Sequence, residues 1–264
     1  MNEKTAFRSI ILIVGALVIV PAAAQPTSPA PDLILIPIVA SHARDATGAV
    51  WSSTVFFNYT LPDVSVFVYD EPILDYRELQ PGERGVLDIH TDKLRVGPGV
   101  MILTYAFASK QLYIESYVYN EAKPEVGVSI PGIRLSDLKV GQPVRLIGVP
   151  LGTGSRTLVR IYAMTSGIDA DVLVRVFDPN GHVLEVDTVH LFSTPLLPRH
   201  ADATQPAYGE YQPPLDPAKY PSISIDIEPL TPATNESPFS AKIWAFSTTT
   251  GSRSENVTAV FPAQ

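Results

Sequence analysis

The chain has 264 residues, a formal net charge of -8, 25 prolines, 16 glycines and no cysteine. An acidic protein repels phosphate and anionic lipid, and no run of Lys or Arg offsets this repulsion, so no nucleic-acid partner is predicted. The lack of cysteine excludes disulfide bridges, thiolate metal sites, a cysteine nucleophile and lipid attachment through cysteine. Stability must therefore come from packing, and the chain is long enough to bury a sizeable core.

Residues 1–24 have the pattern of an export signal. Two basic residues precede an eleven-residue run that is apolar apart from one glycine, and an Ala-Ala-Ala sequence ends at Ala24. That run is too short to cross a hydrocarbon core of about 30 Å, and no later segment approaches the required length. We therefore expect an exported protein, periplasmic or extracellular, whose mature chain has no membrane span and starts with a Pro-rich linker over residues 25–31.

Val, Ile, Tyr, Phe and Thr fill the intervals between the prolines and glycines, which favours strands over helices. The clearest strand is 222–228, where three isoleucines alternate with four polar residues, so that one face is expected to be buried. Further strands are predicted, in chain order, over 51–59, 64–70, 100–107, 111–120, 157–164, 171–178, 182–191, 241–248 and 256–261. The sequence Asp-Pro-Asn-Gly at 178–181 predicts a hairpin turn between two of them. This pattern is typical of an all-β sandwich.

The second half of the chain repeats the pattern of the first. Residues 50–58 and 64–70 parallel 156–164 and 172–178, and residues 112–117 with 126–131 parallel 242–247 with 257–262. We therefore expect two tandem immunoglobulin-like antiparallel sandwiches over residues 32–136 and 137–264, with the boundary near residues 134–141. The alternative is a single larger sandwich.

Several of these segments resemble a group of uncharacterised secreted β-sandwich proteins of Acidobacteria and similar bacteria. The resemblance lies in the two strands within 158–178, in Ile-Trp-Ala-Phe-Ser-Thr-Thr at 243–249 followed by Val-Thr at 257–258, and in the opening segment 36–58. Residues 250–251 are Thr-Gly, where that group commonly has Asn-Asn. The resemblance implies an extracytoplasmic sandwich and no defined activity, because a sandwich fold does not by itself specify a function.

Sequence patterns for catalysis are not found. The chain has no nucleophile elbow, no His-Glu-x-x-His zinc motif, no phosphate-binding loop and no dinucleotide fingerprint. His182 and His190, the nearest pair of histidines, lie about 26 Å apart along one predicted strand, too far to share a metal ion. Acidic pairs such as Asp169 and Asp171 are the kind that glycoside hydrolysis uses, but they are ordinary at strand ends. We expect a protein that is not an enzyme, with no catalytic residue, metal site or cofactor.

The connection from Ser193 to Pro221 has the composition of a binding surface. It is rich in proline and contains Tyr208, Tyr211 and Tyr220. Long loops are often functional, and tyrosines on a stiff backbone stack on sugar rings or anchor a protein partner. These three residues are the candidate ligand-binding residues of an exported binding or structural module with a protein or glycan ligand. A carbohydrate-binding module is the alternative function and a hydrolase with an unrecognised site is the third. For the segment itself we favour the simpler interpretation, a partly disordered insert whose tyrosines cover an open sheet edge.

Overall fold

A computed structural model describes residues 31–40, 42–45, 48–61, 66–70, 75–87, 100–105, 109–164, 169–193, 206–230, 242–251 and 257–263. Strands dominate these residues, and their pairings are antiparallel, which confirms the predicted all-β sandwich class. None of the described residues belongs to a helix that is long and apolar enough to cross a membrane. The predicted export signal lies outside the described residues. Pro31, which the prediction places in the linker, is instead the first residue of a strand.

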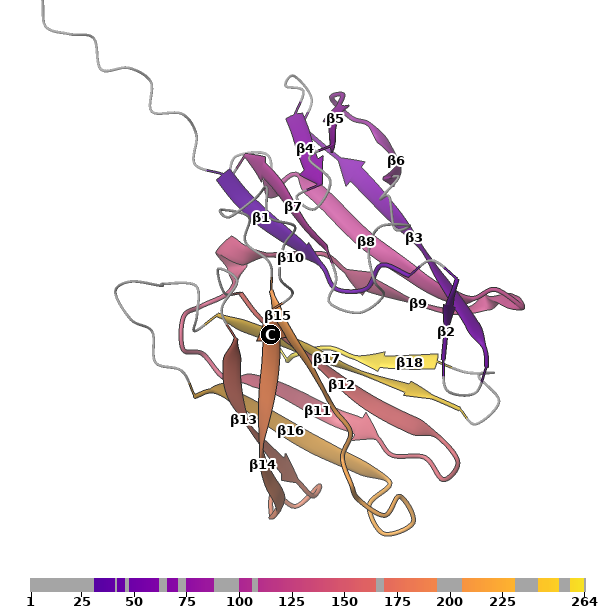
Figure 1. The fold of residues 1–264 in the computed structure, drawn as a ribbon, viewed down its shortest axis with the longest axis vertical. Helices are drawn as coiled ribbons and strands as arrows, with labels where there is room; N and C mark the ends of the chain where they lie inside the picture. The colour runs from indigo at the N-terminus through magenta and orange to yellow at the C-terminus, as the bar shows by residue number, and fades with distance from the viewer. Residues whose placement is uncertain are drawn as a thin grey trace, which may run out of the picture.

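The first half of the chain forms two sheets (Figure 1). One sheet has the order β10-β1-β7-β4-β5, with β10 at Ile133–Arg134, β1 at Pro31–Ile36, β7 at Val100–Tyr105, β4 at Val66–Asp70 and β5 at Asp75–Leu79. The other has the order β2-β3-β8-β9, with β2 at Ala43–Arg44, β3 at Val50–Tyr59, β8 at Leu112–Asn120 and β9 at Lys123–Pro131, and β6 at Arg84–Leu87 beside β3. A core that includes Ile34, Phe57 and Ile114 lies between the two sheets.

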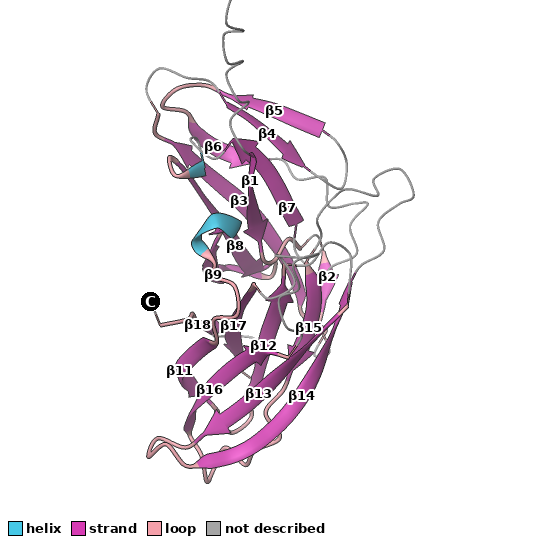
Figure 2. Ribbon diagram, turned by 90° about the vertical axis from the view of Figure 1, so that its left-hand side faces the viewer, coloured by secondary structure: helices cyan, strands magenta, loops and turns pink. Residues whose placement is uncertain are grey.

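The second half forms one sheet of eight strands in the order β11-β16-β13-β14-β15-β12-β17-β18. The strands are β11 at Val144–Pro150, β12 at Arg156–Ala163, β13 at Ala170–Phe177, β14 at Val183–Ser193, β15 at Ala207–Tyr211, β16 at Ser222–Pro229, β17 at Ile243–Thr250 and β18 at Val257–Val260. The sheet curls so that β11 lies against β17 and β18, and it encloses a core that includes Ile161, Val174 and Ile225 (Figure 2).

The two halves repeat one order of strand pairings. When the strands of the two halves are matched in chain order, the paired series β1-β7-β4-β5 corresponds to β11-β16-β13-β14. The paired series β6-β3-β8-β9 corresponds in the same way to β15-β12-β17-β18. Beyond the last strand of each half, the chain crosses back to the first strand of that half. Ile133 pairs with Leu35, and the Ala263 amide donates to the Arg145 carbonyl at 3.1 Å. The segments that parallel each other in sequence therefore occupy corresponding places in the two halves, whereas the immunoglobulin-like assignment stays a prediction.

A third apolar cluster lies between the halves and makes β12 and β17 buried on both faces. Because side chains alternate along a strand, Tyr162, Trp244 and Phe246 point away from the second half's own core. They meet a set of first-half residues that includes Leu35, Val118 and Ile130. Two hydrogen bonds span the same junction: the Tyr162 hydroxyl donates to the Pro37 carbonyl, and Lys242 Nζ donates to the Leu135 carbonyl at 3.0 Å.

The predicted boundary near residues 134–141 contains a short 3-10 helix, η2 (Leu135–Asp137). Leu135 is buried and Leu138 packs against the cluster between the halves, so this connection is part of the junction.

The prediction of individual strands succeeds where alternation is regular. Ile223, Ile225 and Ile227 are all buried along β16, and residues 178–181 form the expected turn, with Gly181 at φ 85°. The predicted strands do not include β1, β2, β5, β6, β9, β10, β11 or β15, although residues 126–131 of β9 are the segment that parallels 257–262. A shift of register between Leu146 and Val149 interrupts the alternation of β11, and β15 lies among prolines, which removes the sequence signal in both places.

Candidate functional site

The predicted loop over residues 193–221 is wrong at its centre, because residues 207–211 form the strand β15. Residues 194–205 lie outside the described part of the chain. Proline is rare inside sheets, but the prolines here flank the strand and leave it intact, and β15 pairs with β12 along its length. Tyr208 and Tyr211 consequently lie on opposite faces of one strand, since they are an odd number of residues apart.

The three candidate tyrosines are all engaged with the protein. Tyr211 is 5% exposed, packs in the second half's core and donates its hydroxyl to a carboxylate oxygen of Glu185 at 2.9 Å. Burial, and then this carboxylate, raise the pKa of Tyr211. Tyr208 packs on the cluster between the halves, with its ring centroid 5.2 Å from that of Tyr162. Tyr220 packs against the second half's core. The structure does not bring the three rings together as one exposed surface.

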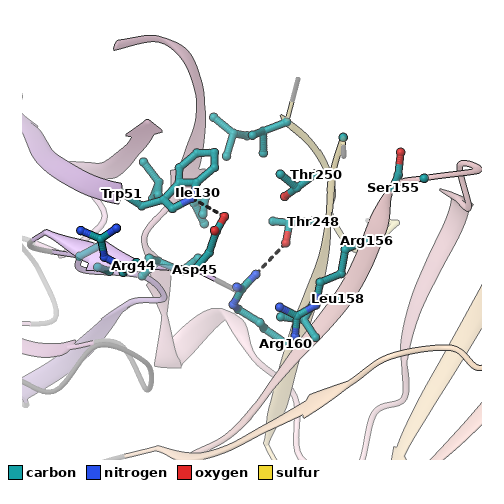
Figure 3. A pocket seen from close by; sticks show the side chains of 18 residues that line it. Arg44, Asp45, Trp51, Ile130, Ser155, Arg156, Leu158, Arg160, Thr248 and Thr250 are labelled. Atoms are coloured by element: carbon teal, nitrogen blue, oxygen red, sulfur yellow. Dashed lines mark hydrogen bonds between the residues drawn. The ribbon is translucent and has the colours of Figure 1, made fainter. Parts of the chain in front are cut away.

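A cavity of about 420 Å³ lies elsewhere, at the junction between the halves (Figure 3). We call it the junction cleft. Both halves contribute to its walls, and most of the lining is apolar. The apolar side chains that the two walls present include Ile38, Val118, Val128, Ile130, Leu158 and Val257. The cleft is therefore a product of the way the halves pack, and neither half forms it alone.

The second half's wall is built by alternation on β12. Arg156, Leu158 and Arg160 share the face that points at the first half, and they pair with Thr250, Thr248 and Phe246 of β17. Arg160 is held firmly: Nη1 donates to Thr248 Oγ1 at 2.7 Å, and its guanidinium carbon lies 5.9 Å from the centroid of the Phe246 ring. Its Nε also lies 3.5 Å from a carboxylate oxygen of Glu210.

Arg156 lies at the rim of this wall and is exposed. Within the described part of the chain, its guanidinium makes no hydrogen bond or ion pair. The two arginines of β12 thus differ in role. Arg160 is fixed by its neighbours, whereas Arg156 has its donors available at the mouth of the junction cleft.

The first half's wall presents Trp51, from β3. The Trp51 Nε1–H donates to Asp45 Oδ2 at 2.9 Å, and Asp45 Oδ1 accepts the Ala49 amide at 3.0 Å. Arg44 Nη1 donates to the Gly48 carbonyl at 3.2 Å, and Gly48 has a φ of 88°, which favours glycine. This short connection between β2 and β3 therefore fixes the tryptophan ring at the edge of the junction cleft, as Figure 3 shows.

The charged side chains of the cleft are unusual for this protein. Among the described residues, Arg44, Arg156 and Arg160 line it together with one acidic residue, Asp45, and Glu210 lies behind Arg160, whereas the whole chain carries a net charge of -8. The cleft is therefore a positively charged region of an acidic protein.

The acidic pair Asp169 and Asp171 contacts a histidine. His190 Nδ1 lies 2.7 Å from Asp171 Oδ1, and its Nε2 lies 3.5 Å from Asp169 Oδ2. The hydrogen bond to Asp171 is the main cause of a raised His190 pKa. No group of three or more metal-ligating side chains is found among the residues that the structure describes.

Comparisons with protein-family models, curated proteins and solved structures find no match to the chain. The resemblance to secreted bacterial sandwich proteins therefore stays a prediction, and no residue role is transferred from another protein.

Sequence reasoning did not find the junction cleft. Its one signal in the sequence is the pair Arg156 and Arg160, which places two cations on one face of an otherwise apolar strand. Trp51 begins a predicted strand, 51–59, and carries no binding signal in the sequence. It is only partly buried and packs at the junction, where it also lines the cleft.

Proposed function

We propose that this protein is a non-catalytic binding protein that acts outside the cytoplasmic membrane and holds a small ligand in the junction cleft. The observation that carries this proposal is the cleft itself, with its volume of about 420 Å³. Small-molecule sites have volumes of about 300–1,000 Å³, are mostly apolar with a few placed polar groups, and often lie between domains. The cleft has each of these properties.

The rigidity of the walls supports a binding role. Most of the lining residues belong to strands, and the cluster between the halves, with the hydrogen bonds from Tyr162 and Lys242, holds these strands in place. A site that is already formed loses little conformational entropy when a ligand binds, so more of the contact energy appears as affinity.

The remaining parts of the proposal rest on the sequence and on strand order. Export rests on the signal pattern of residues 1–24. The non-catalytic assignment rests on the lack of any nucleophile, metal or cofactor motif in the sequence. The repeated order of pairings supports two tandem units, 32–136 and 137–264, with the ligand between them. That these units are immunoglobulin-like sandwiches rests on the strand pattern of the sequence.

A fragment screen by ligand-observed NMR tests the binding role. Val257 lines the cleft, so Val257→Phe places an aromatic ring in the space that a ligand needs. Val186→Phe makes the same change on β14 at a residue that is 55% exposed and is not part of the cleft. We expect fragments that bind the native protein and Val186→Phe but not Val257→Phe. A library from which no fragment distinguishes the two folded variants would contradict the proposal.

A further inference from the structure

We infer that the ligand of the junction cleft is a small organic carboxylate with an apolar body, and that Arg156 binds its carboxylate. This inference rests on the proposed function and adds the chemical class of the ligand. It follows from three features of the cleft: the available guanidinium of Arg156, the sign of the charges around it and the apolar walls beneath it.

Arg156 is the group best placed to bind a carboxylate. Its guanidinium has no hydrogen-bond or ion-pair partner in the described part of the chain, and it lies at the rim of the cleft. A guanidinium presents its N–H groups as a planar fork that matches the two oxygens of a carboxylate. Figure 3 shows the Arg156 and Arg160 side chains on the same wall, with Leu158 between them in the strand.

A second donor lies beside this wall. Thr248 Oγ1 accepts the hydrogen bond of Arg160, and a hydroxyl that accepts still has its own proton to donate. Thr250, which pairs with Arg156 across the two strands, contributes another hydroxyl to the lining. A carboxylate at this wall therefore meets hydroxyl donors as well as the guanidinium.

The charge balance selects an anion. In the described part of the lining there are three arginines and one aspartate, and Asp45 accepts hydrogen bonds from Trp51 and from the Ala49 amide. Glu210 offsets the charge of Arg160, so a cationic ligand would be repelled mainly by Arg156 on the β12 wall. A neutral ligand would leave Arg156 partly dehydrated without a partner, which is unfavourable.

The apolar lining requires more than a charged group. Val118, Val128 and Ile130 of the first half face Leu158 of the second half across the cleft. Removing apolar surface from water on both sides of a bound hydrocarbon or ring is favourable, whereas a bare inorganic anion would leave these walls without contact. The ligand class that satisfies both walls is an amphiphilic carboxylate.

Isothermal titration of the full chain with four probes tests this class: octanoate, neutral octanamide, cationic octylammonium and inorganic phosphate. We expect octanoate to bind at least about tenfold more tightly than octanamide, since hydrogen bonds to charged groups contribute that much. Octylammonium and phosphate are expected to bind more weakly still. Added salt should weaken octanoate binding, because it screens the arginines.

Arg156→Gln and a matched control variant assign the carboxylate contact. Arg156→Gln should weaken octanoate binding about tenfold and leave octanamide binding unchanged, because only the charged contact is removed. Arg84→Gln makes the same change of charge at an exposed residue of β6 that is not part of the cleft, and it should bind octanoate as the native protein does.

Three results would overturn the inference while the binding function stands. In the first, octanamide or octylammonium binds as tightly as octanoate. In the second, Arg156→Gln and Arg84→Gln lose octanoate affinity equally. In the third, the fragment screen finds ligands of the cleft and none of them is a carboxylate. If octanoate binding survives Val257→Phe unchanged, the carboxylate site lies outside the cleft, and the inference fails. The proposed function fails separately, when no ligand of any class distinguishes Val257→Phe from Val186→Phe.

Discussion

Phe246 is one of the large side chains that join the two halves. Its side chain is fully buried in the cluster between them. The ring centroid lies 5.2 Å from that of Trp244, 6.1 Å from that of Phe261 and 6.4 Å from that of Tyr162. We predict that Phe246→Ala lowers the free energy of unfolding by about 3–5 kcal/mol, the usual cost of truncating a buried phenylalanine.

The magnitude follows from two contributions. Burial of the ring contributes about 1.5–3 kcal/mol through the apolar surface removed from water. The rest comes from the cavity that the truncation leaves and from the lost ring contacts, which contribute about 0.5–1.5 kcal/mol each in favourable geometries. Urea unfolding at equilibrium, followed by circular dichroism, measures the total.

Hydrogen exchange shows which strands lose amide protection when Phe246 is truncated. Phe246 lies in the second half but packs against the first, so Phe246→Ala should reduce amide protection in β1 as well as in β17. Ile225→Ala removes a buried side chain that belongs only to the second half's core, and it should reduce protection mainly there. A loss of stability below about 1 kcal/mol, or equal exchange patterns in the two variants, would refute the view that this cluster couples the halves.

Two further predictions concern a histidine and a glycine. The folded-state pKa of His190 is raised, chiefly by its hydrogen bond to Asp171, so the protonated pair stabilises the fold below the ordinary pKa of 6.5. This stabilisation is lost as the pH rises through the higher folded pKa, so the urea midpoint of the native protein should fall over that pH range. The urea midpoint of His190→Gln should not show this fall. Gly127→Ala places a methyl group 2.6 Å from the Tyr117 ring and 2.7 Å from a backbone carbonyl, which should cost about 1–3 kcal/mol. Gly85→Ala, where the nearest atom is at 3.4 Å, is the control, and similar melting temperatures for the two glycine variants would contradict the clash.

Local patterns in the sequence account for much of the architecture. The alternation of Ile223, Ile225 and Ile227 fixes which face of β16 is buried, because successive side chains of a strand point to opposite sides. Asn180-Gly181 permits the tight turn that joins β13 to β14, since positive φ is accessible to glycine. The correspondence between the halves is also visible in the sequence, because both halves bury equivalent strands.

Two features of the second half are harder to predict from the sequence: a strand among prolines, and the orientation of strands that are buried on both faces. The sequence around β15 is rich in proline, and its strand conformation depends on pairing with β12, which is distant in the chain. Tyr208 and Tyr211 therefore look like loop residues in the sequence although both pack against the protein in the structure. On β12 and β17 both faces are buried, so period-two alternation is lost and nothing local shows which face meets the other half.

The sequence by itself determined the all-β class, the main strands and the repeat of their order, since these depend on the period of hydrophobic residues and on local turn chemistry. Only the tertiary structure decided the junction cleft. Trp51 and Arg156 are more than a hundred residues apart, and they line one cavity because Tyr162, Trp244 and Phe246 bring the halves together. A site built between two packed surfaces has no local period, so its residues become recognisable only once the packing is known.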